Sequence, residues 1–78
     1  MLFGETEARI GQRVKKERQF RGWTQKFVAH KLGFPDSSYI SRIESGKRQV
    51  NTKELGDFAK LFNVSLDHLL FGHTGDDF

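Results

Sequence analysis

Apolar residues recur three or four positions apart along most of the chain, a spacing typical of amphipathic helices. Strand-like alternation does not persist beyond a few positions, and no internal repeat is visible. The pattern predicts an all-α chain of five short helices. They are expected at Glu5 or Thr6 to Arg21, Thr24 to Leu32, Ser37 to Ser45, Asn51 to about Phe62, and Leu66 to Phe71.

Each expected helix carries an apolar stripe, and we assign the stripes of the first four helices to the core. The stripes consist of Ile10 and Val14; Val28, Ala29 and Leu32; Ile40 and Ile43 with Tyr39 beside them; Leu55, Phe58, Ala59 and Phe62; and Leu66, Leu69 and Leu70. Trp23 is expected in the core between the first two helices. Phe20 and Phe27 lie off the main stripes, so we expect them to cover the edge of the core.

Residues that start and stop helices lie between these stripes. Glycines follow the first three helices and the last one, where a left-handed residue commonly ends a helix. Pro35 places a turn before the third helix, and Asp36 is its natural N-cap. The run Asn51-Thr52-Lys53-Glu54 resembles a capping box, Ser65 caps the last helix, and Asn63 can adopt the left-handed conformation.

Composition narrows the classes of function that the chain can have. Its 78 residues suit one domain, which we place at residues 1–72, followed by a flexible acidic tail at 73–78. The absence of cysteine and of paired histidine spacing predicts no metal, and no cofactor is expected. The sequence shows no nucleophile–base–acid arrangement, so we do not expect an enzyme. No apolar run is long enough to span a membrane and no secretory leader is visible, so a cytoplasmic protein is expected.

Positive charge is concentrated in the first part of the chain. Residues 1–50 hold 11 Lys and Arg against 5 Asp and Glu, whereas residues 51–78 hold 2 against 5. A basic front and an acidic back favour a polyanionic partner on one side of the domain, and nucleic acid is one such partner.

The segment Thr24–Gly46 has the parts of a helix-turn-helix: two short helices joined by a tight turn and followed by a basic loop. The helices must cross closely, which requires a small residue such as Ala29, and Gly33 tolerates the positive φ of the turn. Helix Ser37–Ser45 is anchored by inward isoleucines. Its outward polar residues, available for base edges in a major groove, are Ser37, Ser38, Ser41 and Arg42.

These motifs, ordered and correctly spaced from about Ile10 to Leu70, resemble the lambda-repressor/Cro-like (XRE) family. The matching runs are Gly22-Trp23-Thr24-Gln25, Val28-Ala29, Leu32-Gly33, Tyr39 to Arg48, and Phe62 to Leu70. The resemblance implies a five-helix, lambda-repressor-like DNA-binding domain. It also implies a homodimer that binds an inverted-repeat operator in double-stranded DNA.

The resemblance also implies roles for individual residues. Thr24 and Gln25 open the second helix, and Gln25 matches a position that contacts phosphate. Ser38, Ser41 and Arg42 match recognition positions. Lys47 and Arg48 match a phosphate-gripping loop, and Arg18 and Glu44 match an ion pair that holds the recognition helix on the core.

One departure from the family pattern lies in the turn. Five residues separate Gly33 from Tyr39 where the family usually has four, and we place the extra residue at Phe34-Pro35. This leaves open whether Ser37 or Ser38 leads the reading face. Serine pairs with several bases, so its base preference does not follow from the sequence.

Two kinds of protein contact are also expected. Leu66, Leu69, Leu70 and Phe71 exceed what a small core requires, so we assign homodimerisation to the last helix. The same fold can instead serve as a protein-interaction module, as in antitoxins that bind a toxin or in factors that recruit a co-regulator. In that alternative, Phe20, Phe27 and the acidic tail would carry the function.

Overall fold

The computed structural model describes residues 3–72, with side chains from Arg9 onward. Its five α-helices are α1 (Phe3–Phe20), α2 (Gln25–Leu32), α3 (Ser38–Glu44), α4 (Thr52–Phe62) and α5 (Leu66–Phe71). Residues 3–72 contain no strand, so the predicted all-α chain is confirmed. The expected acidic tail, residues 73–78, lies outside the described residues.

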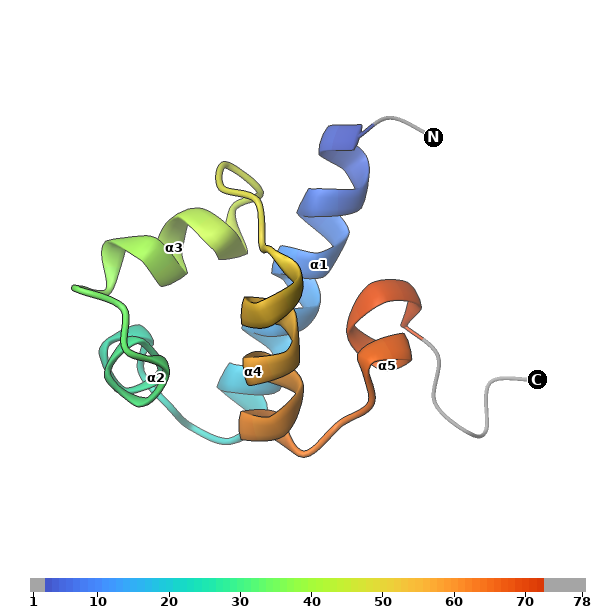
Figure 1. The fold of residues 1–78 in the computed structure, drawn as a ribbon. Helices are drawn as coiled ribbons and strands as arrows, with labels where there is room; N and C mark the ends of the chain where they lie inside the picture. The colour runs from blue at the N-terminus through green and yellow to red at the C-terminus, as the bar shows by residue number, and fades with distance from the viewer. Residues whose placement is uncertain (1–2, 73–78) are drawn as a thin grey trace.

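Helices α1 and α4 run through the middle of the molecule, with α2 and α3 on one side and α5 on the other (Figure 1). Helix α1 contacts both α3 and α5, which lie well beyond it in the chain. The long first helix is therefore the element on which the recognition segment and the last helix both dock.

The predicted helix ends are largely confirmed. The Thr24 hydroxyl accepts the Phe27 N–H at 3.0 Å, and Asn51 and Glu54 form a reciprocal capping box. Helix α4 ends at Asn63 in the left-handed conformation, with φ of 56°. The largest difference from the predicted boundaries is at the start of α1, which begins earlier, at Phe3. Helix α3 is shorter by one residue at each end, and α1 ends one residue earlier than predicted. Helices α2 and α4 begin one residue after Thr24 and Asn51.

The buried core draws on all five helices. It comprises Ile10, Val14, Val28, Ala29, Ile40, Ile43, Leu55, Phe58, Ala59, Phe62 and Leu69. Trp23, expected in the core, is only half-buried and stacks at the edge of it on Phe62, with ring centroids 6.1 Å apart. The predicted apolar stripes therefore supply the core, and burial of their surface is the main force that holds these short helices together.

Five aromatic rings form a continuous row across this core, which we call the aromatic row. In order they are Trp23, Phe62, Phe58, Phe34 and Tyr39, with successive centroids 6.1, 5.9, 6.4 and 5.7 Å apart. Arginines lie at the two ends: Arg21 over Trp23 and Phe62, and Arg48 over Phe34 and Tyr39. The row connects the start of α3 with the far end of α4.

The crossing of α1 and α3 depends on Gly11, to which the sequence patterns assigned no role. A Cβ at this position would lie 2.1 Å from the Ile43 carbonyl oxygen and 3.0 Å from that of Glu44. Both contacts are to backbone, which cannot move aside as a flexible side chain would. Gly11 therefore lets the end of the recognition segment approach α1 without intervening atoms.

Polar groups fix α5 against α1. The Arg13 guanidinium donates to the carbonyl oxygens of Leu69 and Leu70 at 3.1 and 2.9 Å. The Glu17 carboxylate lies 2.7 Å from His68 Nε2 and also accepts from Arg21 at 2.8 Å. The Arg13 hydrogen bonds satisfy carbonyl groups in the last turn of α5, and the Glu17 contact connects the side chain of His68 to α1.

We predict that Gly11→Ala destabilises the protein although alanine favours helices. The gain in helix propensity is at most about 1 kcal/mol, whereas overpacking against fixed backbone costs about 1–3 kcal/mol or more. Gly56→Ala in α4 is the matched control, because a Cβ there meets nothing within 4 Å. Chemical denaturation should show a loss of stability for Gly11→Ala and a small gain for Gly56→Ala. Equal effects of the two changes would contradict the close approach at Gly11.

Glu17→Gln should reduce stability by about 1–3 kcal/mol at neutral pH, because a charged hydrogen-bond acceptor is lost. Burial tends to raise the pKa of Glu17, but hydrogen bonds from Arg21 and His68 outweigh it and lower the pKa from 4.5. A carboxyl with a lowered pKa stabilises the fold above its unfolded value, and this contribution disappears as pH falls through the folded value.

The difference in unfolding free energy between wild type and Glu17→Gln should therefore shrink as pH is lowered from about 5 to about 3. Denaturant titrations across this range measure it. A difference that stays constant would show that the Glu17 carboxylate charge does not stabilise α5 on α1.

Candidate nucleic-acid interface

Helices α2 and α3 and the turn between them form the predicted helix-turn-helix. The turn begins at Gly33, whose φ of 78° is in the left-handed region as expected. Phe34 N–H then donates to the Ala29 carbonyl oxygen at 2.9 Å, which ends α2 firmly. Ile40 and Ile43 are fully buried, so the opposite face of α3 is directed to solvent.

The N-cap of α3 is Ser37, one residue after the predicted cap, and the Ser37 side chain makes no capping hydrogen bond. The predicted cap, Asp36, bonds instead to the first residue of α3. Its carboxylate accepts the Ser38 N–H at 2.8 Å and also the Ser38 hydroxyl. These hydrogen bonds from Ser38 lower the pKa of Asp36. Ser38 is exposed and is the first residue of α3, whereas Ser37 precedes the helix and is half-buried.

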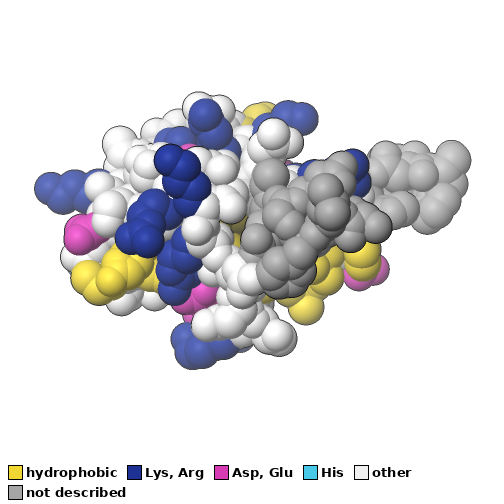
Figure 2. All heavy atoms as spheres, turned by 90° about the horizontal axis from the view of Figure 1, so that it is seen from above, with side chains coloured by type: hydrophobic (Ala, Val, Ile, Leu, Met, Phe, Trp, Pro, Cys, Tyr) yellow, Lys and Arg dark blue, Asp and Glu magenta, His cyan; other side chains and the backbone are white. Residues whose placement is uncertain are grey.

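Two further predicted contact residues lie on the exposed face of α3. Ser41 and Arg42 are both exposed, and Ser45 next to them follows the end of the helix. Figure 2 views the molecule from above relative to Figure 1 and shows several Lys and Arg side chains on that side. The face combines short hydrogen-bonding side chains with positive charge, as a surface that binds a polyanion requires.

A buried ion pair holds α3 in place. Arg18 Nε and Nη2 donate to the two Glu44 carboxylate oxygens at 2.7 and 3.0 Å, in the bidentate geometry that arginine and carboxylate favour. Their side chains are only 11% and 3% exposed. Arg18 Nη1 also donates to the Trp23 carbonyl oxygen at 2.8 Å, so one side chain fixes α1, the loop before α2, and the end of α3.

Gln25 is attached to the same pair. Its Nε2 donates to Glu44 Oε1 at 3.1 Å, and the side chain is half-buried. One hydrogen of the amide group is occupied in this way and the other is left for a further acceptor. Thr24 is exposed, but its hydroxyl already caps α2. The N-terminus of α2 thus presents a pre-oriented amide beside the exposed face of α3.

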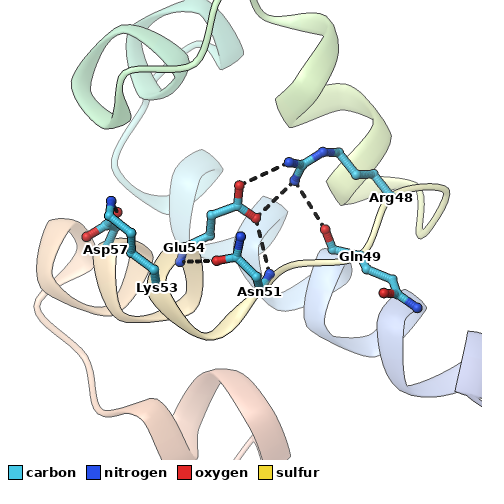
Figure 3. A network of polar contacts seen from close by, with 6 residues as sticks. All are labelled: Arg48, Gln49, Asn51, Lys53, Glu54 and Asp57. Carbon is cyan, nitrogen blue, oxygen red and sulfur yellow. Dashed lines mark hydrogen bonds and ion pairs between the residues drawn. The ribbon is translucent and has the colours of Figure 1, made fainter.

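The two cations of the loop after α3 stand in different surroundings. Lys47 is exposed, and its side chain forms no hydrogen bond or ion pair with the described residues. Arg48 is instead turned toward α4, where Nη1 and Nη2 each donate to a Glu54 oxygen at 3.0 Å (Figure 3). The family resemblance implied phosphate contact for both residues. In the structure Lys47 is exposed, whereas Arg48 is half-buried.

The charges of Arg48 and Glu54 stabilise each other. Hydrogen bonding to Arg48 lowers the pKa of Glu54 despite its partial burial. The same hydrogen bonds raise the pKa of Arg48. Both groups are therefore fully charged at neutral pH. The pairing with Glu54 had no signal in the sequence beyond the capping box, because Arg48 lies in a loop of irregular conformation.

The four residues assigned to dimerisation do not form one exposed set. Leu66 is 44% and Phe71 62% exposed, and Leu70 is half-buried. Leu69 is fully buried in the core, so the prediction is corrected for this residue: it has no surface left for a partner. Helical geometry explains the difference, since α5 turns one side of its apolar stripe toward α1 and α4.

Two further aromatic residues lie near the edge of the core, Phe27 within α2 and Phe20 at the end of α1. Phe27 packs on Trp23 with centroids 5.1 Å apart, as expected for the edge of the core. Phe20 is 86% exposed, so the expectation that it covers the edge of the core is wrong for this residue. The Arg21 guanidinium lies 5.9 Å from its ring centroid. Among the described residues, no group of three His, Asp or Glu side chains could hold a metal ion. No helix in this part of the chain is long and apolar enough to cross a membrane.

Comparison with known proteins matches this arrangement. A helix-turn-helix family model matches residues 14–69. The transcriptional regulator ImmR of Bacillus subtilis is 39% identical over 61 residues, which cover 78% of this chain and 47% of ImmR. YazB of the same organism, an uncharacterised HTH-type transcriptional regulator, is 36% identical over 64 residues, covering 81% of this chain and 91% of YazB.

A solved structure adds to this evidence. The restriction-modification controller protein C.AhdI from Aeromonas hydrophila superposes with a TM-score of 0.72 at 27% identity, covering 80% of this chain and 92% of that one. The chain spans about half the length of several of the curated relatives that it matches. With the family model covering most of the chain, the protein belongs to the lambda-repressor/Cro-like (XRE) family of helix-turn-helix DNA-binding proteins.

Proposed function

We propose that this protein is a sequence-specific regulator of transcription that binds an inverted-repeat operator in double-stranded DNA as a homodimer. The observation that carries the proposal is that α3 is anchored to the core by one face and exposed to solvent on the other. Buried Ile40, Ile43 and Glu44 fix α3, while Ser38, Ser41 and Arg42 face solvent. Such a helix fits a major groove, where side chains near its N-terminus meet base edges.

Contacts to the DNA backbone would come from the two ends of the helix-turn-helix. Thr24 and Gln25 lie at the N-terminus of α2, whose partial positive charge favours phosphate. Lys47 follows α3 and is exposed. These residues would set the register of the protein on the duplex, and the outward residues of α3 would read the sequence.

Within α3 we assign the leading reading position to Ser38 rather than Ser37. Ser38 is exposed, and Ser37 is half-buried before the helix begins. The Ser38 hydroxyl hydrogen is held by Asp36, so its oxygen remains as an acceptor for a base donor. Arg42, one turn further, can donate two hydrogen bonds to guanine.

Helix α5 is the proposed dimer interface. Leu66 and Phe71 are exposed large apolar side chains, and Leu70 lies half-buried between them in sequence. A C2 dimer through this helix would place two copies of α3 in successive major grooves about 34 Å apart. The name of C.AhdI, a controller protein, favours a repressor or controller among the possible regulators. This function would place the protein in the cytoplasm with the nucleoid.

A second candidate function is a protein-interaction module, such as an antitoxin. The observation that favours it is Phe20, whose ring is 86% exposed at the end of α1. Capture of a defined toxin or co-regulator by wild type, but not by Phe20→Ser, would support this candidate. If that capture were found and no operator preference appeared at about 150 mM salt, the first proposal would be replaced.

Operator selection from random duplexes is the direct test of DNA recognition and of the dimer. We expect a motif with two-fold symmetry. Leu66→Asp should weaken the dimer by at least about 1 kcal/mol in sedimentation equilibrium and reduce affinity for the full operator more than for one half-site. Phe20→Asp is the control, because it places the same charge on another exposed apolar residue. Dimer dissociation by Phe20→Asp alone would move the interface away from α5.

Arg42→Ala should cost about 1–3 kcal/mol in binding to the selected operator and relax preference at one base pair. Lys60→Ala in α4 is the control, since Lys60 is equally exposed and its loss lowers the net charge by the same amount. Titrations at fixed salt measure both variants. If the two variants bind the operator equally well, Arg42 does not read a base.

A further inference from the structure

Arg48 is immobilised by more contacts than a cation awaiting phosphate would have. Its guanidinium donates twice to the Glu54 carboxylate and once to the Gln49 carbonyl oxygen at 3.1 Å, as Figure 3 shows. The same group lies 5.5 Å from the ring centroids of both Phe34 and Tyr39. An arginine fixed by a fork of hydrogen bonds and two rings has lost most of its freedom to reach elsewhere.

The two rings under Arg48 lie on either side of the residue at which α3 begins. Phe34 belongs to the turn that is one residue longer than the family pattern, and Tyr39 lies in the first turn of α3. The rings stack on each other at 5.7 Å, and Phe34 continues the aromatic row onto buried Phe58. The longer turn is thus held in place, because the Phe34 ring lies between Phe58 of the core and Arg48.

The anchor of Arg48 is itself rigid. Glu54 N–H donates to Asn51 Oδ1 at 2.8 Å, and Glu54 Oε1 accepts the Asn51 N–H at 3.2 Å. Glu54 therefore serves the start of α4 and Arg48 at once. Glu54 and Arg48 together connect the first turn of α4 to Tyr39 in the first turn of α3. The apolar spacing of the sequence did not indicate this connection.

We propose that Arg48 is a positioning residue for DNA recognition, which sets the start of α3 through Phe34 and Tyr39 instead of gripping phosphate itself. This inference rests on the proposed function. It assigns the loop two separate tasks: Lys47 contacts the backbone of DNA, and Arg48 holds the reading face in register. The proposal also explains how the longer turn is accommodated, since Arg48 holds the Phe34 ring of that turn against the core.

Arg48→Lys separates the two roles, because lysine keeps the charge but has neither the fork nor the planar face. A positioning role predicts that operator affinity relative to random duplex falls about tenfold, as for one mismatched base pair, while the dependence of affinity on salt stays unchanged. Lys47→Met is the matched comparison. It should lower the log–log salt slope by about 1 per subunit and leave the preference for the operator in place.

Glu54→Gln is a second variant that releases Arg48 without touching it. Glutamine is accepted at this position of a capping box, so the start of α4 is retained. If Arg48 grips phosphate, its release should leave operator binding equal or tighter. If Arg48 positions α3, Glu54→Gln should lose discrimination as Arg48→Lys does. Operator binding by Glu54→Gln that equals wild type, or an Arg48→Lys variant that equals wild type, would overturn the proposal.

Amide hydrogen exchange tests the positioning role without DNA. The Ser41 N–H bonds to the Ser37 carbonyl oxygen in the first turn of α3, and the Ser45 N–H bonds to that of Ser41 at its end. Arg48→Lys and Glu54→Gln should each speed amide exchange at Ser41 relative to Ser45. Unchanged exchange at both sites would count against the proposal. Loss of operator preference by wild type itself would refute the proposed function, while the exchange result would still decide the role of Arg48.

Discussion

The bidentate pair of Arg18 and Glu44 is the interaction on which the recognition segment depends. Helix α3 has seven residues, too few to be stable alone in water, so its position must come from tertiary contacts. The pair connects it to α1 at a site almost closed to solvent, and Gln25 and the Trp23 carbonyl share the same two groups. Removing one partner would strand a buried charge, which typically costs about 3–5 kcal/mol.

The pair can act in this way only because the backbones of α1 and α3 are close. Gly11 allows that approach, and apolar burial of Ile40 and Ile43 beside it supplies the cohesive energy. The other end of α3 is held differently, by the aromatic row and Arg48. The recognition helix is therefore fixed at both ends and exposed on one face. It has little freedom to adapt its position, which favours discrimination between DNA sequences over binding to any duplex.

Charge is divided by task across the molecule. Arg13, Arg18, Arg21 and Arg48 use their hydrogen bonds within the fold, on carboxylates or on helix-ending carbonyl groups. Arg42 and Lys47 remain exposed near α3. The basic excess of the first fifty residues is therefore a poor measure of DNA contact by itself, since much of it stabilises structure. The proposed contacts of Arg42 and Lys47 with DNA rest on the family to which the chain belongs, and not on the charge balance.

The sequence by itself determined the elements and their caps. Apolar spacing placed all five helices, and Thr24, Asp36, Asn51, Glu54, Asn63 and Ser65 act at helix ends as their side chains or backbone preferences require. These features are local, so a few neighbouring residues suffice to specify them. The match of ordered motifs also identified the fold and the pair of Arg18 and Glu44 before any contact was known.

Only the tertiary structure decided which side chains are free to act. It showed that Gly11 is a contact point, that Leu69 belongs to the core, and that Arg48 turns inward while Lys47 turns outward. Each outcome depends on a partner distant in the chain or on an irregular loop, where spacing carries no information about direction. Two adjacent cations are alike in sequence, and their surroundings, a carboxylate and two rings on one side and solvent on the other, give them different roles.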